Sequence, residues 1–356
     1  MHVVVGGDIG GAERVVLDLA TRPEATRADH QVAVITPNRA LAAYFTGAGI
    51  RVHDRGPARE NPLAYLYRSL GPTDVAWLSA RLAQEAIDVV HTHTFGSHVL
   101  GTRAARRVRR PQIRTEHHVM HYFDASSSPF TRWAAVRTDR FVAVSEYVRR
   151  VLVEAAPRLA DRMTVVRNGV DTAYFSPRDR GPDEFCAGIV CRLTGWKRVH
   201  LAIEAAALAG VELVVIGDGE ERGRLEALAL ERGARVRFVG FQADPRAFVA
   251  ACDAILSTSE SEPLGLSVLE ALAMGRPVIA FAAGGIPEIV EDGVTGMLVT
   301  EPTAAALAGV LARARGDRSA LAAMGARARD FVAVHCSIDR MCQGYAAEYE
   351  AVSRAP

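Results

Sequence analysis

Short apolar runs rich in Val and Ile alternate along the chain with longer stretches in which Ala, Leu and Arg recur. In the first half we expect strands at residues 3–6, 31–36, 50–53, 88–93, 112–116, 140–145 and 164–167. In the second half we expect them at residues 185–192, 212–217, 236–240, 254–258, 277–281 and 296–299. Strands that alternate with helical stretches are typical of repeated βα units and parallel sheets. Each half is therefore predicted to form its own Rossmann-like, doubly wound parallel sheet.

The length supports the same division, because 356 residues exceed what one hydrophobic core usually holds. Turn formers and charged residues crowd residues 168–182, as expected of a linker. We expect an N-terminal domain at residues 1–170, a C-terminal domain at residues 171–335, and a helix over residues 336–356. Two such domains facing each other would form a cleft, and open α/β sheets bind ligands at the carboxyl ends of their strands.

The composition is that of an ordinary soluble protein, with 49% hydrophobic and 23% charged residues. A net charge of +1 argues against a dedicated nucleic-acid binder. The charge is uneven, since residues 1–171 carry 23 Arg against 17 acidic residues (+6) and the rest carries 19 basic against 24 acidic residues (−5). The arginine run at residues 103–110 fits either a solvated helix face or contact with anionic lipid head groups.

The five cysteines show no CxxC pairing, which favours reduced thiols in a cytoplasm over a disulfide scaffold. The chain opens on an expected strand and not on the apolar core of a signal peptide. No apolar run is long enough to span a bilayer. We therefore expect a cytoplasmic protein and leave peripheral contact with the inner membrane face open. The sequence does not indicate an oligomeric state.

Only one of the 42 basic residues is a lysine, Lys197, and it lies five positions after Arg192. Lysine is a compact, strongly hydrated point charge, whereas arginine is a planar fork. Two cations just beyond a strand end suit a diphosphate, whose charge grows when a leaving group departs. The alternative is a pair of solvated charges on a loop.

Two glutamates, Glu262 and Glu270, flank an expected turn from strand to helix. The turn places N–H groups at a helix N-terminus, where they can bind a phosphate. The residues that offer these groups are Gly265, Leu266 and Ser267. Carboxylates accept hydrogen bonds from sugar hydroxyls, and Glu270 lies in an otherwise apolar run, where an acid needs a partner or a ligand. The alternative is that both glutamates are surface charges.

A glycine-rich turn at residues 6–11 follows the first expected strand and opens a helix, where N–H groups could approach a phosphate. The spacing is not G-x-G-x-x-G, and no acidic residue follows the second strand, so a dinucleotide site fits poorly. A tight structural turn is the alternative.

Nine of the eleven histidines precede residue 122. His91 and His93 close one expected strand, and His117, His118 and His121 follow the next. HxH and H-x3-H spacings can bind zinc. For any single histidine, a hydrogen-bonded polar role at a strand end is the simpler interpretation.

Taken together, these segments resemble the retaining glycosyltransferases of family 4, which have the two-domain GT-B fold. The resemblance covers nearly the whole chain, and the order and spacing of the matching segments are more specific than any one of them. These segments are residues 10–14, 88–93, 144–145, 168–171, 192–197, 217–219, 240–241 and 262–296. The resemblance implies transfer of a sugar from a UDP-sugar or GDP-sugar to an acceptor hydroxyl, with retention of configuration and with no metal or cofactor.

The resemblance also implies roles for single residues. Arg192 and Lys197 would hold the donor diphosphate, and Glu262 would bond the hydroxyls of the transferred sugar. Glu270 would bond the ribose, and His117 would approach the donor sugar from the first domain. The implied catalytic residues are His117, Arg192, Lys197 and Glu262. The other implied donor-binding residues are Gly10, Gly11, Gly240, Phe241, Gly265, Leu266, Ser267 and Glu270.

Some positions depart from the family pattern: Cys191 and Arg198 stand where Gly is usual, and Leu264 replaces a common Phe. None of these changes removes a charge that the chemistry needs. A nucleotide-sugar epimerase on the same fold, a non-catalytic sugar-nucleotide binding module and a metal hydrolase built on the first-half histidines remain as alternatives. The acceptor is left open, with its pocket expected near residues 54–70 and 117–132.

Overall fold

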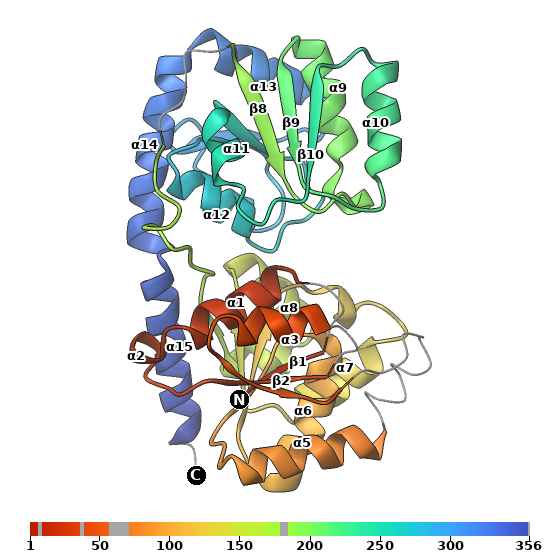
Figure 1. Cartoon of the computed structure of the whole chain (residues 1–356), viewed down its shortest axis with the longest axis vertical. Helices are drawn as coiled ribbons and strands as arrows, with labels where there is room; N and C mark the ends of the chain where they lie inside the picture. Colours follow the sequence, from red (N-terminus) through yellow and green to blue (C-terminus); the bar gives the residue numbers. More distant parts are fainter. Residues whose placement is uncertain (6–8, 36–38, 57–70, 179–183, 355–356) are drawn as a thin grey trace. The chain divides into compact units, whose positions relative to one another are not determined.

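The computed structural model describes residues 1–5, 9–35, 39–56, 71–178 and 184–354 (Figure 1). The chain divides into two compact units, which are Met1–Asn168 together with Asp339–Pro356, and Gly169–Ile338. Parts of three expected features lie outside the described residues: the glycine-rich turn at 6–8, the acceptor region at 57–70 and the linker at 179–182.

The first unit has a parallel sheet in the order β3-β2-β1-β4-β5-β6-β7. Its strands are β1 (His2–Val4), β2 (Gln31–Val34), β3 (Arg51–Asp54), β4 (Val90–Thr92), β5 (Gln112–Glu116), β6 (Arg140–Ala143) and β7 (Met163–Val165). Its helices are α1 (Gly11–Ala20), α2 (Pro23–Thr26), α3 (Arg39–Thr46), α5 (Pro72–Gln84), α6 (Phe95–Val108), α7 (Ser128–Ala135), α8 (Glu146–Ala155) and α15 (Ile338–Ser353), with short 3-10 turns at Met120–Tyr122 and Pro157–Arg162. The strand order reverses between β1 and β4, where sheets of this kind bind ligands.

The second unit has a parallel sheet in the order β10-β9-β8-β11-β12-β13. Its strands are β8 (Cys186–Val190), β9 (Glu212–Ile216), β10 (Val236–Gly240), β11 (Ala254–Ser257), β12 (Val278–Phe281) and β13 (Gly296–Val299). Its helices are α9 (Val199–Ala209), α10 (Arg222–Glu231), α11 (Arg246–Ala251), α12 (Leu266–Ala273), α13 (Ala304–Gly316) and α14 (Arg318–His335), with 3-10 turns at Gly195–Lys197 and Ile286–Glu288. Figure 1 shows α9 and α10 beside the strands β8–β10. Here the order reverses between β8 and β11.

Every strand expected from the sequence is present, and the prediction of two doubly wound parallel sheets is confirmed. Most of the inner strands are buried along nearly their whole length, because helices cover both faces of each sheet, so most of them appear in the sequence as apolar runs without alternation. The edge strands β3 and β10 are more exposed. The predicted ends err by a few residues, as at β4, where Asp88 and Val89 precede the strand.

Residues 169–177 directly follow the boundary between the two units, as expected of a linker, but they are not a free connection. Val170 and Phe175 are buried in the apolar core of the second unit, and Val170 pairs with Ser337 in an isolated parallel bridge. These two apolar side chains dock the segment, although the turn formers around them are typical of a free connection.

The terminal helix α15 packs on the first unit. Tyr345 and Tyr349 of this helix are buried, and Glu348 forms an ion pair of 3.0 Å with Arg140 of β6. Glu350 reaches Arg27, which follows α2. Among the described residues, no helix combines the length and apolar character needed to cross a membrane.

Candidate functional site

The candidate site of the second unit is built where the strand order reverses. β8 and β11 are parallel neighbours with Ala187 opposite Ala254, so the loops that follow them emerge side by side. The loop after β8 carries Lys197, and the loop after β11 carries Glu262. Topology therefore brings together two residues that lie 65 positions apart in the sequence.

Lys197 and Glu262 form a close ion pair, with 2.6 Å between Nζ and Oε2. Their side chains are only 12% and 13% exposed, so solvent screens this pair less than a surface pair. The ammonium also lies 4.0 Å from the centre of the Trp196 ring, a cation–π distance. The single lysine of the chain is thus held in one place by a carboxylate and an aromatic face.

Two hydroxyls fix the loops that carry this pair. The Ser259 hydroxyl donates to Glu262 Oε2 at 2.9 Å, and the Thr258 hydroxyl donates to the backbone carbonyl of Lys197 at 2.8 Å. Both residues are buried. The loop after β8 is therefore tied directly to the loop after β11, which makes the pair a preorganised feature.

Helix α12 begins at Leu266, beside the ion pair. Its N-cap, Gly265, has φ of +95°, a left-handed conformation that favours glycine. The first N–H groups of a helix have no partner within the helix and carry partial positive charge. Ser267, in the first turn, lines the same pocket as Lys197 and Glu262. This helix start can therefore accept an anion, as the sequence suggested.

Gly284 and Gly285 allow the backbone to approach the Glu262 loop closely. The Gly285 N–H donates to the Glu262 carbonyl at 2.7 Å. Gly284 has φ of +64°, and a Cβ there would collide with the backbone of Glu262. The pair of glycines in the longest matching segment therefore supports the carboxylate of the site.

The pocket is also lined by Cys191, which stands where the family usually has Gly. Burial raises the pKa of the Cys191 thiol to about 12, with Lys197 opposing this shift and Glu262 adding to it. The thiol is therefore neutral near neutral pH and is neither a nucleophile nor a metal ligand in this state.

The remaining donor-site candidates of the second unit lie around these loops. Arg192 follows β8 with an exposed side chain, and Glu270 is half-buried in the second turn of α12. Gly240 ends β10 with φ of +71°, and Phe241 beside it is 76% exposed. An exposed phenyl ring of this kind can stack on a base. The pocket itself gathers Lys197, Glu262 and Ser267, and its lining does not include Arg192, Glu270 or Phe241.

Gly10, Gly11 and His117 belong to the first unit. Gly10 caps α1, and its N–H donates to the Glu13 carboxylate at 2.9 Å; α1 begins at Gly11. His117 directly follows β5, is partly exposed and contacts His93 at 3.2 Å through Nε2. Burial, followed by the charge of Arg114, lowers the pKa of His117 to about 3.

A buried ionic cluster holds the segment that contains His117. Glu116 accepts hydrogen bonds from Arg114 at 2.9 Å and from the Tyr122 hydroxyl at 2.7 Å, and His121 lies 3.1 Å from it. Although burial alone raises the pKa of Glu116, Arg114 and His121 hold it well below its ordinary value. The turn after β5 is thus fixed on both sides of His117.

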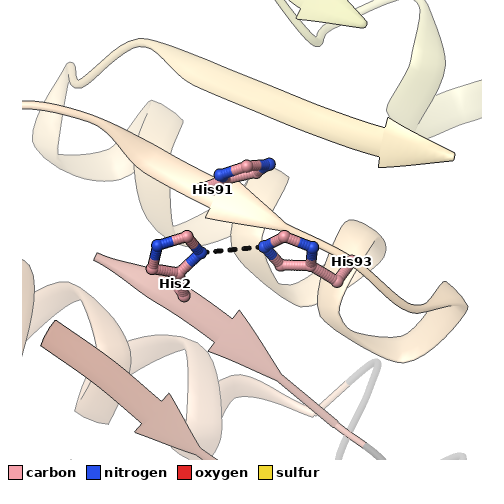
Figure 2. A group of neighbouring side chains, drawn as sticks. All are labelled: His2, His91 and His93. Atoms are coloured by element: carbon pink, nitrogen blue, oxygen red, sulfur yellow. Dashed lines mark hydrogen bonds between the residues drawn. The ribbon is translucent and has the colours of Figure 1, made fainter. Parts of the chain in front are cut away.

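Two of the histidines that the sequence singled out, His91 and His93, lie together with His2. His2, His91 and His93 have ring nitrogens within 4.8 Å of one another, a distance that metal ligands can have. Figure 2 shows His2 and His93 pointing toward each other, with a hydrogen bond of 2.9 Å between them. His91 bonds the hydroxyls of Tyr349 and Thr115 at 2.9 and 2.8 Å. A cation would have to replace some of these bonds, so the arrangement favours a hydrogen-bonded cluster over a metal centre.

Sequence reasoning missed several residues of these sites. Thr258, Ser259 and Trp196 had no distinctive spacing. Trp196 and Ser259 contact Lys197 and Glu262 as near neighbours in the sequence, whereas the bond of Thr258 to Lys197 depends on the pairing of β8 with β11. The contact of His2 with the later histidines depends on the pairing of β1 with β4, which sets His2 opposite His91. The high density of histidine in the first half was the available signal.

Comparisons with known proteins agree with this architecture. The family model described as glycosyl transferases group 1 matches residues 172–331, and the model of glycosyltransferase family 4 matches residues 9–174. D-inositol 3-phosphate glycosyltransferase of Nocardia farcinica is 30% identical over 90% of this chain and 80% of its own length. Alpha-maltose-1-phosphate synthase of Mycolicibacterium smegmatis is 31% identical over 60% of this chain and 65% of its own length, so this chain matches just under two thirds of that relative.

Among solved structures, Anabaena HepE in complex with UDP and glucose superposes with a TM-score of 0.85, at 26% identity and over 98% of both chains. The two Rossmann-like units are those of the GT-B glycosyltransferases. The matches in sequence and in fold cover both units, and they show that this chain belongs to the glycosyl transferases of group 1, within glycosyltransferase family 4.

Proposed function

We propose that this protein transfers a sugar from a nucleoside-diphosphate donor to an acceptor hydroxyl, with retention of the anomeric configuration. One observation carries the proposal: the only lysine of the chain is held at the strand-order reversal of the second unit, beside a carboxylate and a helix N-terminus. A cation, hydrogen-bond donors and a carboxylate are what a sugar diphosphate requires.

The leaving group of this reaction is a diphosphate, and its negative charge grows as the glycosidic bond breaks. Lys197 and the first N–H groups of α12 stabilise that charge, and Arg192 adds a second cation. If each donor acts as in other oxyanion sites, its loss lowers the rate on the order of 100-fold. This positive site supplies the stabilisation that a metal ion supplies elsewhere, so the reaction is proposed to be metal-independent.

In this proposal the Glu262 carboxylate binds the sugar as well as its partners within the protein. Without donor, its carboxylate bonds Lys197 and Ser259. An ammonium has three N–H bonds and can turn one of them toward a phosphate while it keeps Glu262. The carboxylate in turn has acceptor positions left for sugar hydroxyls. We assign Glu262 to binding the sugar and not to nucleophilic attack, and the departing phosphate takes the proton of the acceptor in a front-face reaction.

The other assignments follow the family resemblance. Glu270 bonds the ribose, and Phe241 with Gly240 lies at the base. His117 contacts the donor sugar. Gly10 and Gly11 complete the set of proposed donor-binding residues. A related structure contains UDP-glucose, which supports a UDP-sugar as the first donor to test.

A thermal-shift panel of UDP-sugars and GDP-sugars, followed by an acceptor screen with the best stabiliser, tests the proposal. We expect one donor class to raise the melting temperature, and product to form only when an acceptor is added. Conversion of the donor without acceptor would identify an epimerase, and binding without turnover would identify a binding module. Loss of transfer on adding a chelator would contradict the metal-independent mechanism.

A further inference from the structure

A continuous chain of side chains leads from helix α2 to His117 in the first unit. Thr26 Oγ1 lies 2.6 Å from His30 Nε2, and His30 Nδ1 lies 2.9 Å from His2 Nε2. His2 Nδ1 lies 2.9 Å from His93 Nε2, and His93 Nδ1 lies 3.2 Å from His117 Nε2. We call these five residues the imidazole chain. Each of its three inner histidines uses one ring nitrogen toward each neighbour.

The hydrogen bonds of Thr26, at the end of the imidazole chain away from His117, determine which ring nitrogen of each histidine carries the proton. The Thr26 hydroxyl lies 2.9 Å from the backbone carbonyl of Arg22, which can only accept. A hydroxyl has a single proton, so when Thr26 donates it to Arg22, it must accept from His30 Nε2. A neutral imidazole has one donor and one acceptor nitrogen. His30 Nδ1 must then accept from His2, and the same step repeats along the chain.

The same reasoning determines the tautomer of His117, the last residue of the imidazole chain. With every contact carrying one hydrogen, each histidine of the imidazole chain has its proton on Nε2, and His117 donates from Nε2 to His93 Nδ1. The opposite direction would leave the Thr26–Arg22 contact without a hydrogen. Among the described residues, His117 Nδ1 has no hydrogen-bond partner, and the side chain is partly exposed. This nitrogen is left with a lone pair for a ligand.

The lowered pKa values of the histidines in the imidazole chain are consistent with neutral rings. Burial lowers the pKa of His2 and His93 well below the ordinary value, and it lowers the pKa of His30 to about 4. A second proton on one of these inner rings would also place two hydrogens between a pair of neighbouring ring nitrogens, where there is room for one. His117 therefore offers an acceptor without a positive charge.

We propose that the imidazole chain is a positioning device that fixes His117 as the Nε2–H tautomer and presents Nδ1 as a hydrogen-bond acceptor for a ligand hydroxyl. Thr26, His30, His2 and His93 act through His117 and do not touch the ligand. The tautomer follows from the first unit alone. That the ligand is a sugar rests on the proposed function.

Nitrogen-15 NMR of histidine-labelled protein tests the tautomer without any substrate, with the His117→Gln spectrum to assign the signal. We expect a protonated Nε2 and an unprotonated Nδ1 for His117. Thr26→Val removes the hydroxyl at the far end, so the proton direction is no longer imposed and the His117 signal should shift toward Nδ1–H. Thr26→Ser should keep the wild-type signal. Thr46→Val is the matched control, because the Thr46 hydroxyl also donates to a carbonyl four residues earlier, at the exposed end of α3.

A wild-type His117 that is protonated on Nδ1 would overturn the proposal, and so would a folded Thr26→Val variant with an unchanged tautomer. Addition of Zn²⁺ to the apoprotein is a further arm: stoichiometric binding that removes the Nε2–H signals of His2 and His93 would establish a metal site in place of the chain.

Turnover gives a second, separate readout. Thr26→Val should lower kcat/KM for the donor on the order of tenfold, the effect of one hydrogen bond lost to a ligand, while Thr26→Ser and Thr46→Val should not. A protein that showed the expected tautomers but transferred no sugar would refute the proposed function and leave the tautomer assignment standing. Normal kcat/KM in a Thr26→Val variant whose tautomer has shifted would overturn the acceptor role of Nδ1.

Discussion

Mild acid should destabilise the first unit selectively. His2, His91, His93 and His98 are fully buried there, and burial lowers the pKa of each well below the ordinary value of 6.5. A histidine with a lowered folded pKa binds its proton only in the unfolded state when the pH lies between the two pKa values. The contribution of these groups to the free energy of unfolding is therefore fully present well above about pH 6.5 and is lost as the pH falls below it.

The size of the effect follows from the ordinary pKa. Between about pH 7.5 and about pH 5.5, each histidine that stays neutral in the folded state costs about 1.4 kcal/mol of stability. The four fully buried groups alone give a loss of about 5 kcal/mol, comparable with the whole stability of a small domain, and the lowered pKa values of His30 and His117 act in the same direction. The depressed pKa of Glu116 adds a further loss of stability only at lower pH, below the ordinary carboxylate pKa, so it does not contribute between these two pH values.

Hydrogen exchange followed by mass spectrometry can measure each unit separately at the two pH values, after correction for the intrinsic exchange rate. Peptides from β1, β4 and β5 should lose protection on acidification. Peptides from β8, β11 and β12 form the internal control, because the second unit contains only His200 and His335. Equal losses in both units, or full protection of the first unit at the lower pH, would refute the reasoning.

A single substitution tests the loss of stability assigned to each buried histidine. His98→Phe removes one titrating ring from a site where His98 Nδ1 has no hydrogen-bond partner and the ring packs edge-on against Phe141. Thr138, the partner of His98 Nε2, keeps other acceptors. The variant should lose about 1.4 kcal/mol less than wild type over the same pH range. An unchanged acid loss would show that His98 is not a neutral buried group.

Three further substitutions have defined outcomes. Gly284→Ala should destabilise the second unit by about 1–3 kcal/mol in chemical denaturation, because its φ is positive and its Cβ would press on the Glu262 backbone; wild-type stability would contradict that contact. Tyr349→Phe should cost the first unit about 1–2 kcal/mol by leaving a buried nitrogen of His91 unpaired, and a neutral result would argue against this bond. Glu270→Ala should raise the KM for the donor on the order of tenfold if it bonds the ribose, with an unchanged KM excluding that role.

Much of the fold could be predicted because parallel strands are buried on both faces. Runs such as the one at β12 are apolar throughout and are flanked by helical stretches, so their positions are visible in the sequence. The docking of the segment at 169–177 was not foreseen, because turn formers surround Val170 and Phe175, and only the three-dimensional core shows where these two side chains are buried.

The candidate site could be predicted in part. Lys197 and Glu262 carry distinctive chemistry, and the crossing point of the sheet brings them together. Their direct ion pair was not foreseen, because a sequence does not show that two groups assigned to one ligand also bind each other. The contact of His2 with His30 depends on the register of β1 with β2, and its contact with the later histidines depends on the register of β1 with β4. The hydrophobic pattern specifies neither register.

Calorimetric titration with a nucleoside diphosphate and with the matching nucleoside tests the central claim most directly. Lys197→Met should weaken binding of the diphosphate on the order of 100-fold, the loss of a charged contact, and should leave binding of the nucleoside unchanged. Arg198→Met is the matched control, since this neighbouring cation pairs with Glu260 at 2.9 Å outside the pocket lining, and it should bind both ligands normally. Equal binding of the diphosphate by wild type and Lys197→Met would contradict the account.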